Sequence, residues 1–346
     1  MAAMTPLLSA LAGDAEIETL LCDEAQIATV LAVERALAEA CADTGWITAA
    51  DAEAVGKAIE GFVPDKEELA AGMARDGVVV PALVKQLRTT IPEPHRMALH
   101  KGATSQDILD TALMLQLARV MDVLEARLTA LLSRLDALAE AEGGRKLMAH
   151  TRMQQALETT WGAKIASWSE PLQRQLRALE AMRRSLLVVQ LGGPVGDRGS
   201  FDGHGDAIAA GLARRLDLGL AAPWHATRDP IIAFGNRLAL VSGVTGKIGA
   251  DVTLLAQNEV GAVRLEGGGG SSAMAHKSNP VRAEVLVALA RFNAGLAGTL
   301  NQAMVHEYER SGAAWTLEWL TLPQMAVTAG ASLRLSLELV EQMRLG

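Results

Sequence analysis

The sequence predicts an all-α protein built around a bundle of five long helices. Alanine and leucine dominate its 346 residues and only 3% are aromatic, which favours helices over a β-sandwich or barrel. Half of the residues are hydrophobic, so the chain has enough apolar surface for a sizeable core. Residues 103–142 contain neither glycine nor proline, which predicts one very long helix.

Residues 1–100 predict a small N-terminal helical domain. Apolar residues recur with helical spacing over residues 14–44, and the pattern ends before Gly45. A second, shorter helix is expected over residues 48–60. Prolines and glycines interrupt residues 61–100, so short helices and turns are expected there.

Residues 101–346 predict the long-helix bundle. Leucines along residues 103–142 recur at steps of three and four, which marks one face of a helix about 50–60 Å long at ~1.5 Å per residue. An apolar stripe of this length needs long partner helices to bury it. Four candidate partner helices are residues 152–191, 230–263, 280–311 and 323–345.

Glycines and prolines add detail to this bundle. Pro171 predicts a kink, and Gly143–Gly144 and Gly192–Gly205 predict loops. Three glycines of the third long helix predict a face where another helix packs closely: Gly243, Gly246 and Gly249.

Charge and cysteine content exclude several classes of protein. The formal net charge of −8 is dispersed, and no basic run suggests a nucleic-acid partner. Cys22 and Cys41 lack the spacing of a disulfide scaffold or zinc site, so we expect buried thiols and no metal. The N-terminus lacks a signal-peptide pattern, and no uninterrupted apolar run reaches bilayer length, which predicts a cytoplasmic protein with no membrane partner.

The segment Gly267–Pro280, with the sequence GGGGSSAMAHKSNP, is the strongest candidate for chemistry. Four glycines allow the following backbone N–H groups to turn inward and form an anion site. Ser271, Lys277 and Asn279 then supply a hydroxyl, a cation and an amide. A Gly/Ser linker between two helices is the alternative. The polar residues after the glycines are unlike those of a linker.

Residues Gly270–Pro280 resemble the mobile-loop signature GSSxMPxKxNP of the fumarase/aspartase superfamily, with Ala275 replacing the usual proline. The resemblance implies a homotetramer with a 20-helix core, in which each active site uses three subunits and needs no cofactor. It also implies that Ser271 transfers a proton and that Lys277 and Asn279 stabilise the negative charge that develops. The remaining matching residues of the loop, Ser272 and Met274, are placed among the substrate-binding residues.

A second region, His100–Asp107, resembles the family element H-x-G-x-T-S-x-D. Thr104 and Ser105 stand at a helix start, where hydroxyl and free N–H groups bind a carboxylate well. The alternative is a capping motif without a ligand. His100 is a further ligand-binding candidate.

A third region, Ala149–Gln154, corresponds to the family element R-T-H-x-Q. Thr151 and Gln154 match the positions that bind carboxylates, whereas Arg152 replaces a histidine that protonates the leaving group in the family's lyases. A carboxylate leaves without a proton, and an arginine can hold it with two hydrogen bonds. A two-residue shift would align His150 with the family histidine, but Thr151 and Gln154 would then lose their alignment.

Several residues around these regions have two interpretations. Glu284 matches a family acid, and the alternative is a solvated glutamate at a helix start. His225, Arg228 and Arg282 would add positive potential around a tricarboxylate substrate, although each is singly a common surface residue.

Within the superfamily, the chain is similar to the 3-carboxy-cis,cis-muconate cycloisomerases. This resemblance implies conversion of 3-carboxy-cis,cis-muconate to 4-carboxymuconolactone by intramolecular carboxylate addition, in protocatechuate and β-ketoadipate catabolism. Two alternatives remain, another lyase such as adenylosuccinate lyase and a non-catalytic structural relative. The similarity stops at the C-terminus, so the further helical domain of many relatives is expected to be absent or truncated.

Overall fold

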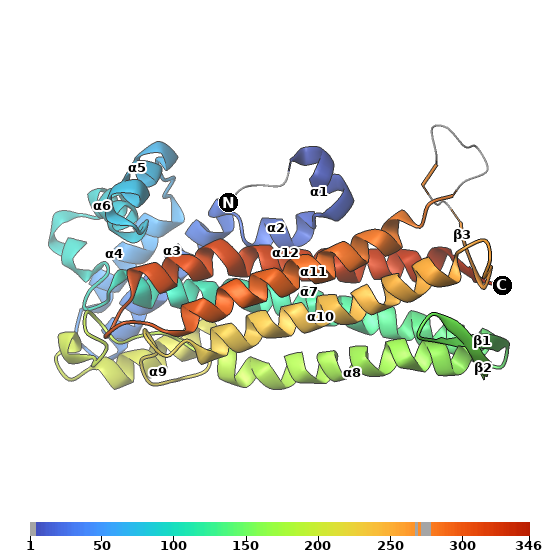
Figure 1. Cartoon of the computed structure of the whole chain (residues 1–346). Helices are drawn as coiled ribbons and strands as arrows, with labels where there is room; N and C mark the ends of the chain where they lie inside the picture. The colour runs from blue at the N-terminus through green and yellow to red at the C-terminus, as the bar shows by residue number, and fades with distance from the viewer. Residues whose placement is uncertain (1–4, 267–268, 271–277) are drawn as a thin grey trace.

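The structure is a computed structural model that describes residues 5–266, 269–270 and 278–346. Five long helices run side by side and form an elongated bundle (Figure 1). This confirms the predicted fold class and the number of long helices in the described part of the chain. The five helices are α7 (Ser105–Glu142), α8 (Trp161–Leu186), α10 (Asp229–Leu255), α11 (Val281–Asn301) and α12 (Gly312–Gln342).

Helix α7 is the central element, with 38 residues and a length of ~57 Å at 1.5 Å per residue. The predicted leucine stripe faces the bundle core. Its fully buried members are Leu124, Leu128, Leu131 and Leu135. Residues at the start of α7 are therefore separated from residues at its end by the full length of this helix.

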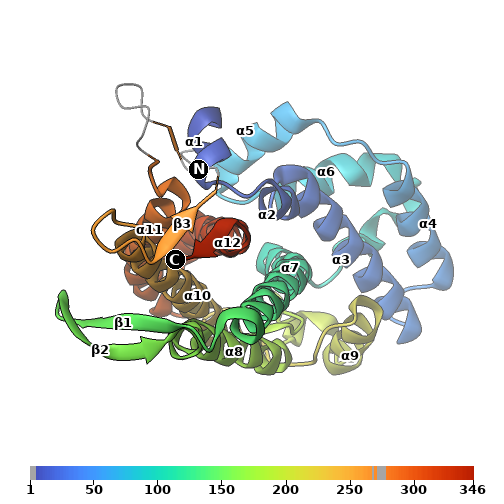
Figure 2. The same ribbon diagram turned by 90° about the vertical axis from the view of Figure 1, so that its right-hand side faces the viewer.

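The N-terminal segments wrap around one side of the bundle, as the view along its axis shows (Figure 2). Residues 14–44 are two helices rather than the single helix predicted, because Cys22 is extended and separates them. The elements are α1 (Pro6–Ala12), α2 (Ala15–Leu20), α3 (Asp23–Asp43), α4 (Ala49–Glu60), α5 (Lys66–Asp76), α6 (Val80–Thr90) and the 3₁₀ helix η1 (Glu93–Ala98).

A second hydrophobic cluster lies beside the bundle core. It joins α3, α4 and α6 to the first turns of α7 and to α9 (Gly205–Leu216). The loop before α9 contains the short 3₁₀ helix η2 (Gly199–Phe201), whose Phe201 is fully buried in this cluster. The domain boundary at residue 100 stays a prediction.

The prediction of a helix that begins at residue 152 is wrong for the first nine residues of that range. Strands β1 (Lys146–Thr151) and β2 (Gln154–Thr160) form an antiparallel hairpin there, and α8 starts only at Trp161. Arg152 and Met153 have φ values of 49° and 65°, as a two-residue hairpin turn requires. The threonines of this segment also favour a strand over a helix.

Other helix bounds also differ from the prediction. Strands β3 (Val263–Leu265) and β4 (Met343–Leu345) pair, so α10 and α12 end earlier than expected. Helix α11 stops at Asn301, before the 3₁₀ helix η3 (Gln302–Met304). Helix α12 begins 11 residues before Pro323, because Ser311 caps it and the proline is accommodated inside the helix.

Two of the three glycines on α10 have the predicted role. A Cβ atom on Gly246 would lie 2.4 Å from that of Ala290, and one on Gly249 would lie 2.4 Å from the Ala283 carbonyl. Both positions therefore allow close packing against α11. Gly243 faces open space among the described residues, so it has no such packing role within the described chain.

Two helices, α10 and residues 281–304, are long and apolar enough to cross a membrane by length and composition alone. Core helices of soluble proteins have the same property. Half of the apolar window in α10 is buried in the bundle, but only 33% of that in the second segment. Much apolar surface of α11 is therefore uncovered in the single chain.

Candidate active site

The predicted region His100–Asp107 lies where the chain enters α7. Asp107 is buried and accepts four hydrogen bonds, from the N–H groups of Thr104 (2.9 Å), Gly192 (2.7 Å) and Gly193 (2.9 Å), and from His225 Nε2 (2.9 Å). The aspartate thus fixes the start of α7 against the Gly192–Gly205 loop. His225 serves this contact, so it does not face a substrate as predicted.

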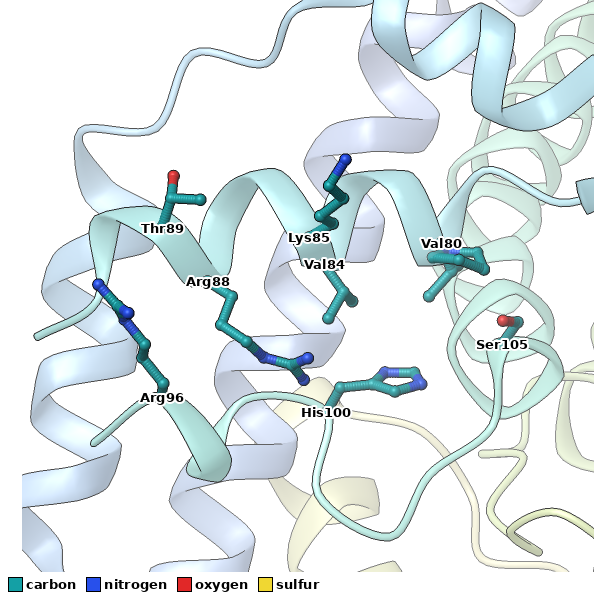
Figure 3. A pocket seen from close by; sticks show the side chains of 9 residues that line it. Val80, Val84, Lys85, Arg88, Thr89, Arg96, His100 and Ser105 are labelled. Carbon is teal, nitrogen blue, oxygen red and sulfur yellow. The ribbon is translucent and has the colours of Figure 1, made fainter. Parts of the chain in front are cut away.

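A cavity of about 510 Å³ opens beside the first turn of α7 (Figure 3). His100 and Ser105 line it, as expected for two ligand-binding residues, and both are half-buried. The positive end of the α7 dipole lies at Ser105, and the first N–H groups of a helix are available to an anion. The remaining lining residues are Val80, Pro81, Val84, Lys85, Arg88, Thr89 and Arg96.

His100 is held in a left-handed conformation with φ 59°, and its Nδ1 lies 2.6 Å from Glu34 Oε1. Burial of the imidazole opposes its protonation, but the charge and hydrogen bond of Glu34 outweigh burial and raise the pKa of His100. The ring therefore keeps its positive charge to a higher pH than a free histidine. A charged imidazole suits an anionic ligand.

Arg228 lies in a buried ion network, which corrects its prediction as a surface cation near the substrate. Its guanidinium donates to Asp110 at 2.6 and 3.1 Å and to Glu318 at 2.9 and 2.6 Å. Burial opposes the charged form, but the two carboxylates outweigh it and raise the pKa of Arg228. The network joins α7 to α12 and to the start of α10. Arg282 also has a partner within the chain, because it forms an ion pair with Glu338 at 2.9 Å.

We expect Arg228→Met to lower the free energy of unfolding by about 3–5 kcal/mol, because it leaves two buried carboxylates without their cation. Arg35→Met is the matched control, since Arg35 pairs with Glu39 and Glu60 on the surface and its loss costs about 1 kcal/mol or less. Chemical denaturation followed by circular dichroism measures both changes. A loss at Arg228 no larger than that at Arg35 would contradict the structural role of the network.

The predicted region Ala149–Gln154 includes the tip of the β1–β2 hairpin, which projects from the bundle (Figure 2). Thr151 and Gln154 pair across the turn, and Arg152 and Met153 occupy the tip. All four residues are exposed. The structure thus presents Arg152 at the most outlying point of this hairpin, between the two predicted carboxylate-binding residues.

The predicted loop Gly267–Pro280 is described only at its base. Gly269 and Asn279 exchange two backbone hydrogen bonds, of 3.0 and 2.8 Å, which close the loop above α11. Glu284 is exposed in the first turn of that helix. No ion pair joins it to Arg152 among the described side chains. The loop residues predicted to act on the substrate, Ser271, Ser272, Met274 and Lys277, lie outside the described residues.

The three regions do not meet within one chain. His100 and Ser105 lie at one end of α7, whereas the hairpin and the Gly269–Asn279 bridge lie at the other (Figure 1). The helix between them is ~57 Å long. Any site that contains residues from both ends therefore needs more than one copy of the chain.

The sequence interpretation missed the cations of the cavity. Lys85 and Arg88 stand three residues apart on α6, and Arg96 follows on η1. The spacing of the first two places them on one helix face, a signal present in the sequence. In the part of the chain that the structure describes, no group of three or more histidine, cysteine, aspartate or glutamate side chains is arranged to hold a metal ion.

Comparisons with known proteins give a consistent result. Residues 6–292 match the family model described as lyase. The chain is 37% identical to the 3-carboxy-cis,cis-muconate cycloisomerase of Bradyrhizobium diazoefficiens, over 95% of this chain and 75% of that protein. It is 38% identical to the protein of the same name from Pseudomonas aeruginosa, over 92% and 71%. The crystal structure of the 3-carboxy-cis,cis-muconate lactonizing enzyme from Pseudomonas putida matches with a TM-score of 0.92 and 35% identity, over 99% of this chain and 78% of that one.

Proposed function

Because the chain belongs to the lyase family of the fumarase/aspartase superfamily, we propose that it is an enzyme that converts 3-carboxy-cis,cis-muconate to 4-carboxymuconolactone. The observation that carries this proposal is the similarity to cycloisomerases in both sequence and structure, over more than nine-tenths of the chain. Such a reaction belongs to the catabolism of aromatic compounds. We place the enzyme in the cytoplasm.

The reaction is an internal addition that needs no second substrate. One carboxylate of the substrate attacks a carbon of its own double bond, and the neighbouring carbon becomes a carbanion delocalised into another carboxylate. Ser271 donates a proton to that carbon, and the resulting alkoxide regains a proton from solvent. Lys277 and the Asn279 amide stabilise the negative charge as it develops.

Six residues of the other two regions bind the substrate in this proposal. Thr104, Ser105 and His100 bind a carboxylate at the positive end of α7, and the raised pKa of His100 favours its charged form there. Thr151 and Gln154 bind at the hairpin. Arg152 holds the attacking carboxylate with its planar guanidinium, and its exposed position at the hairpin tip lets it reach a neighbouring chain.

The active unit in this proposal is a homotetramer with sites shared between subunits. The separation of the predicted site residues by the length of α7 supports this, since one chain cannot assemble them. Exposed apolar side chains on three neighbouring bundle helices support it too. Leu240 on α10, Phe292 on α11 and Leu320 on α12 are each about half exposed, at 50%, 49% and 50%. Association would bury them.

Two alternatives are weaker. A lyase that releases fumarate, such as adenylosuccinate lyase, needs a proton donor for its leaving group, and Arg152 stands where the family places that histidine. A non-catalytic structural relative has no need for the intact set Ser271, Lys277 and Asn279. Glu284 has a role in the site only if a cation from a neighbouring chain reaches it.

We expect the purified protein to remove the ultraviolet absorbance of 3-carboxy-cis,cis-muconate, because lactonisation shortens the conjugated diene. Adenylosuccinate is assayed in parallel for release of fumarate. Loss of muconate absorbance without fumarate release supports the proposed reaction. No loss of absorbance from an assembled protein would reject it, and fumarate release would favour the first alternative.

A further inference from the structure

The cavity beside α7 is strongly cationic. Lys85, Arg88, Arg96 and His100 line it (Figure 3). Lys85 lies 3.6 Å from Glu68 and His100 lies 2.6 Å from Glu34, whereas no carboxylate among the described residues pairs with either arginine. Two guanidinium groups without a carboxylate partner on one cavity wall favour the entry of an anion. The cavity therefore has the chemistry of a site for an anionic ligand.

Arg88 is the cation best placed to bind one. Figure 3 shows its side chain reaching from α6 toward His100. One terminal nitrogen donates to the Leu99 carbonyl at 3.3 Å, whereas the Nε atom is buried and has no hydrogen-bond partner among the described residues. A buried N–H without a partner is costly, and an arginine has five N–H donors in a rigid fork. A ligand carboxylate would satisfy the free donors.

Arg96 approaches the same cavity from η1. Its Nε donates to the Ile91 carbonyl at 2.9 Å, which fixes the side chain against the end of α6. This bond uses one of its donors and holds the guanidinium in place at the cavity wall. The two arginines are thus positioned by backbone carbonyls, and carboxylate side chains neutralise neither of them in the described contacts.

The substrate proposed above carries three carboxylates with different roles. One attacks, and a second takes up the charge of the carbanion. The third sits on the carbon that is attacked, and it neither gains nor loses a bond. Its binding site is therefore free to set which substrate is accepted without taking part in proton transfer.

We propose that Arg88 binds this third carboxylate beside His100, with Arg96 adding positive charge on the same cavity wall, and that the two arginines so select a tricarboxylate over the dicarboxylate cis,cis-muconate. The inference rests on the proposed function for the identity of the substrate. A cationic site rejects a ligand that lacks the matching carboxylate, because its arginines then stay desolvated and unpaired. Lys85, on the exposed rim, adds long-range attraction.

The test compares Arg88→Gln and Arg96→Gln with Arg75→Gln, a control at an exposed arginine of α5 outside the cavity. Equilibrium binding is measured by calorimetry with two probes, tricarballylate and glutarate, which differ only in the central carboxylate. Turnover is measured with 3-carboxy-cis,cis-muconate and with cis,cis-muconate. The binding probes keep the inference testable even if turnover of the tricarboxylate is absent.

We expect the unmodified protein to bind tricarballylate at least about 10-fold more tightly than glutarate. Arg88→Gln and Arg96→Gln should each weaken tricarballylate binding about 10- to 100-fold and change glutarate binding less than about threefold. In turnover, each should raise KM for the tricarboxylate while kcat changes less than about threefold. Arg75→Gln should change none of these values.

Two results would overturn the inference: equal affinity of the unmodified protein for the two probes, or a preference for tricarballylate that survives both substitutions. A preference that depends on Arg88, in a protein that does not lactonise the tricarboxylate, would support the site and reject the proposed reaction. Failure of the site and failure of the proposed function therefore give different results.

Discussion

Ser271→Ala is expected to reduce kcat for lactonisation by about 100- to 10,000-fold and to leave KM nearly unchanged. In our proposal the Ser271 hydroxyl is the group that delivers the proton to the carbanion, and loss of a positioned acid or base costs about 10²- to 10⁴-fold. The carboxylate-binding residues remain in this variant, so substrate binding should persist. Loss of muconate absorbance over time measures both constants.

Ser278→Ala is the matched control for that variant, because it removes a hydroxyl from the same loop, at an exposed position seven residues away. We expect its kcat to stay within about twofold of the unmodified value. Equal losses in the two variants would mean that any disturbance of the loop stops the reaction. A fully active Ser271→Ala protein would remove Ser271 from the mechanism.

The long helices could be predicted from the sequence because their signal is periodic and uninterrupted. The leucine stripe of α7 gave its face and nearly its bounds. The β1–β2 hairpin was missed because its turn places Arg152 and Met153 at positive φ. Arginine and methionine rarely adopt this conformation, so their presence does not indicate such a turn. Pro323 was taken for a helix start, but packing along α12 tolerates it inside the helix.

The site could be predicted only in part. The three regions were recognised because each contains a short motif that is local in sequence. Burial is a tertiary property, so the sequence could not show that Arg228 is enclosed by Asp110 and Glu318. The cavity cations were missed for the same reason, since Arg88 and Arg96 come together only when η1 folds against α6.

Mixing two inactive variants is expected to restore about a quarter of the unmodified activity, if each site takes its α7 end and its loop from different chains. The first variant is Ser105→Glu, which adds a negative charge where the substrate carboxylate binds; like charges there should cost at least about 100-fold in activity. Glutamate is also favourable at a helix start, so α7 should remain intact. The second variant is Ser271→Ala. Each is assayed alone and after co-expression in equal amounts.

The expected recovery follows from random assembly of the two kinds of chain. In an equal mixture, half of the α7 ends and half of the loops are unmodified, so about one site in four receives both. Ser271→Ala mixed with Lys277→Ala is the control, because both changes lie in one loop and no chain in that mixture supplies an intact one. Recovery with this control, or none with the first pair in confirmed mixed tetramers, would contradict sites shared between chains. Helix α7 holds the two regions ~57 Å apart in each chain. Movement of the loop within one chain therefore cannot explain a recovery that is seen in the first mixture and not in the control mixture.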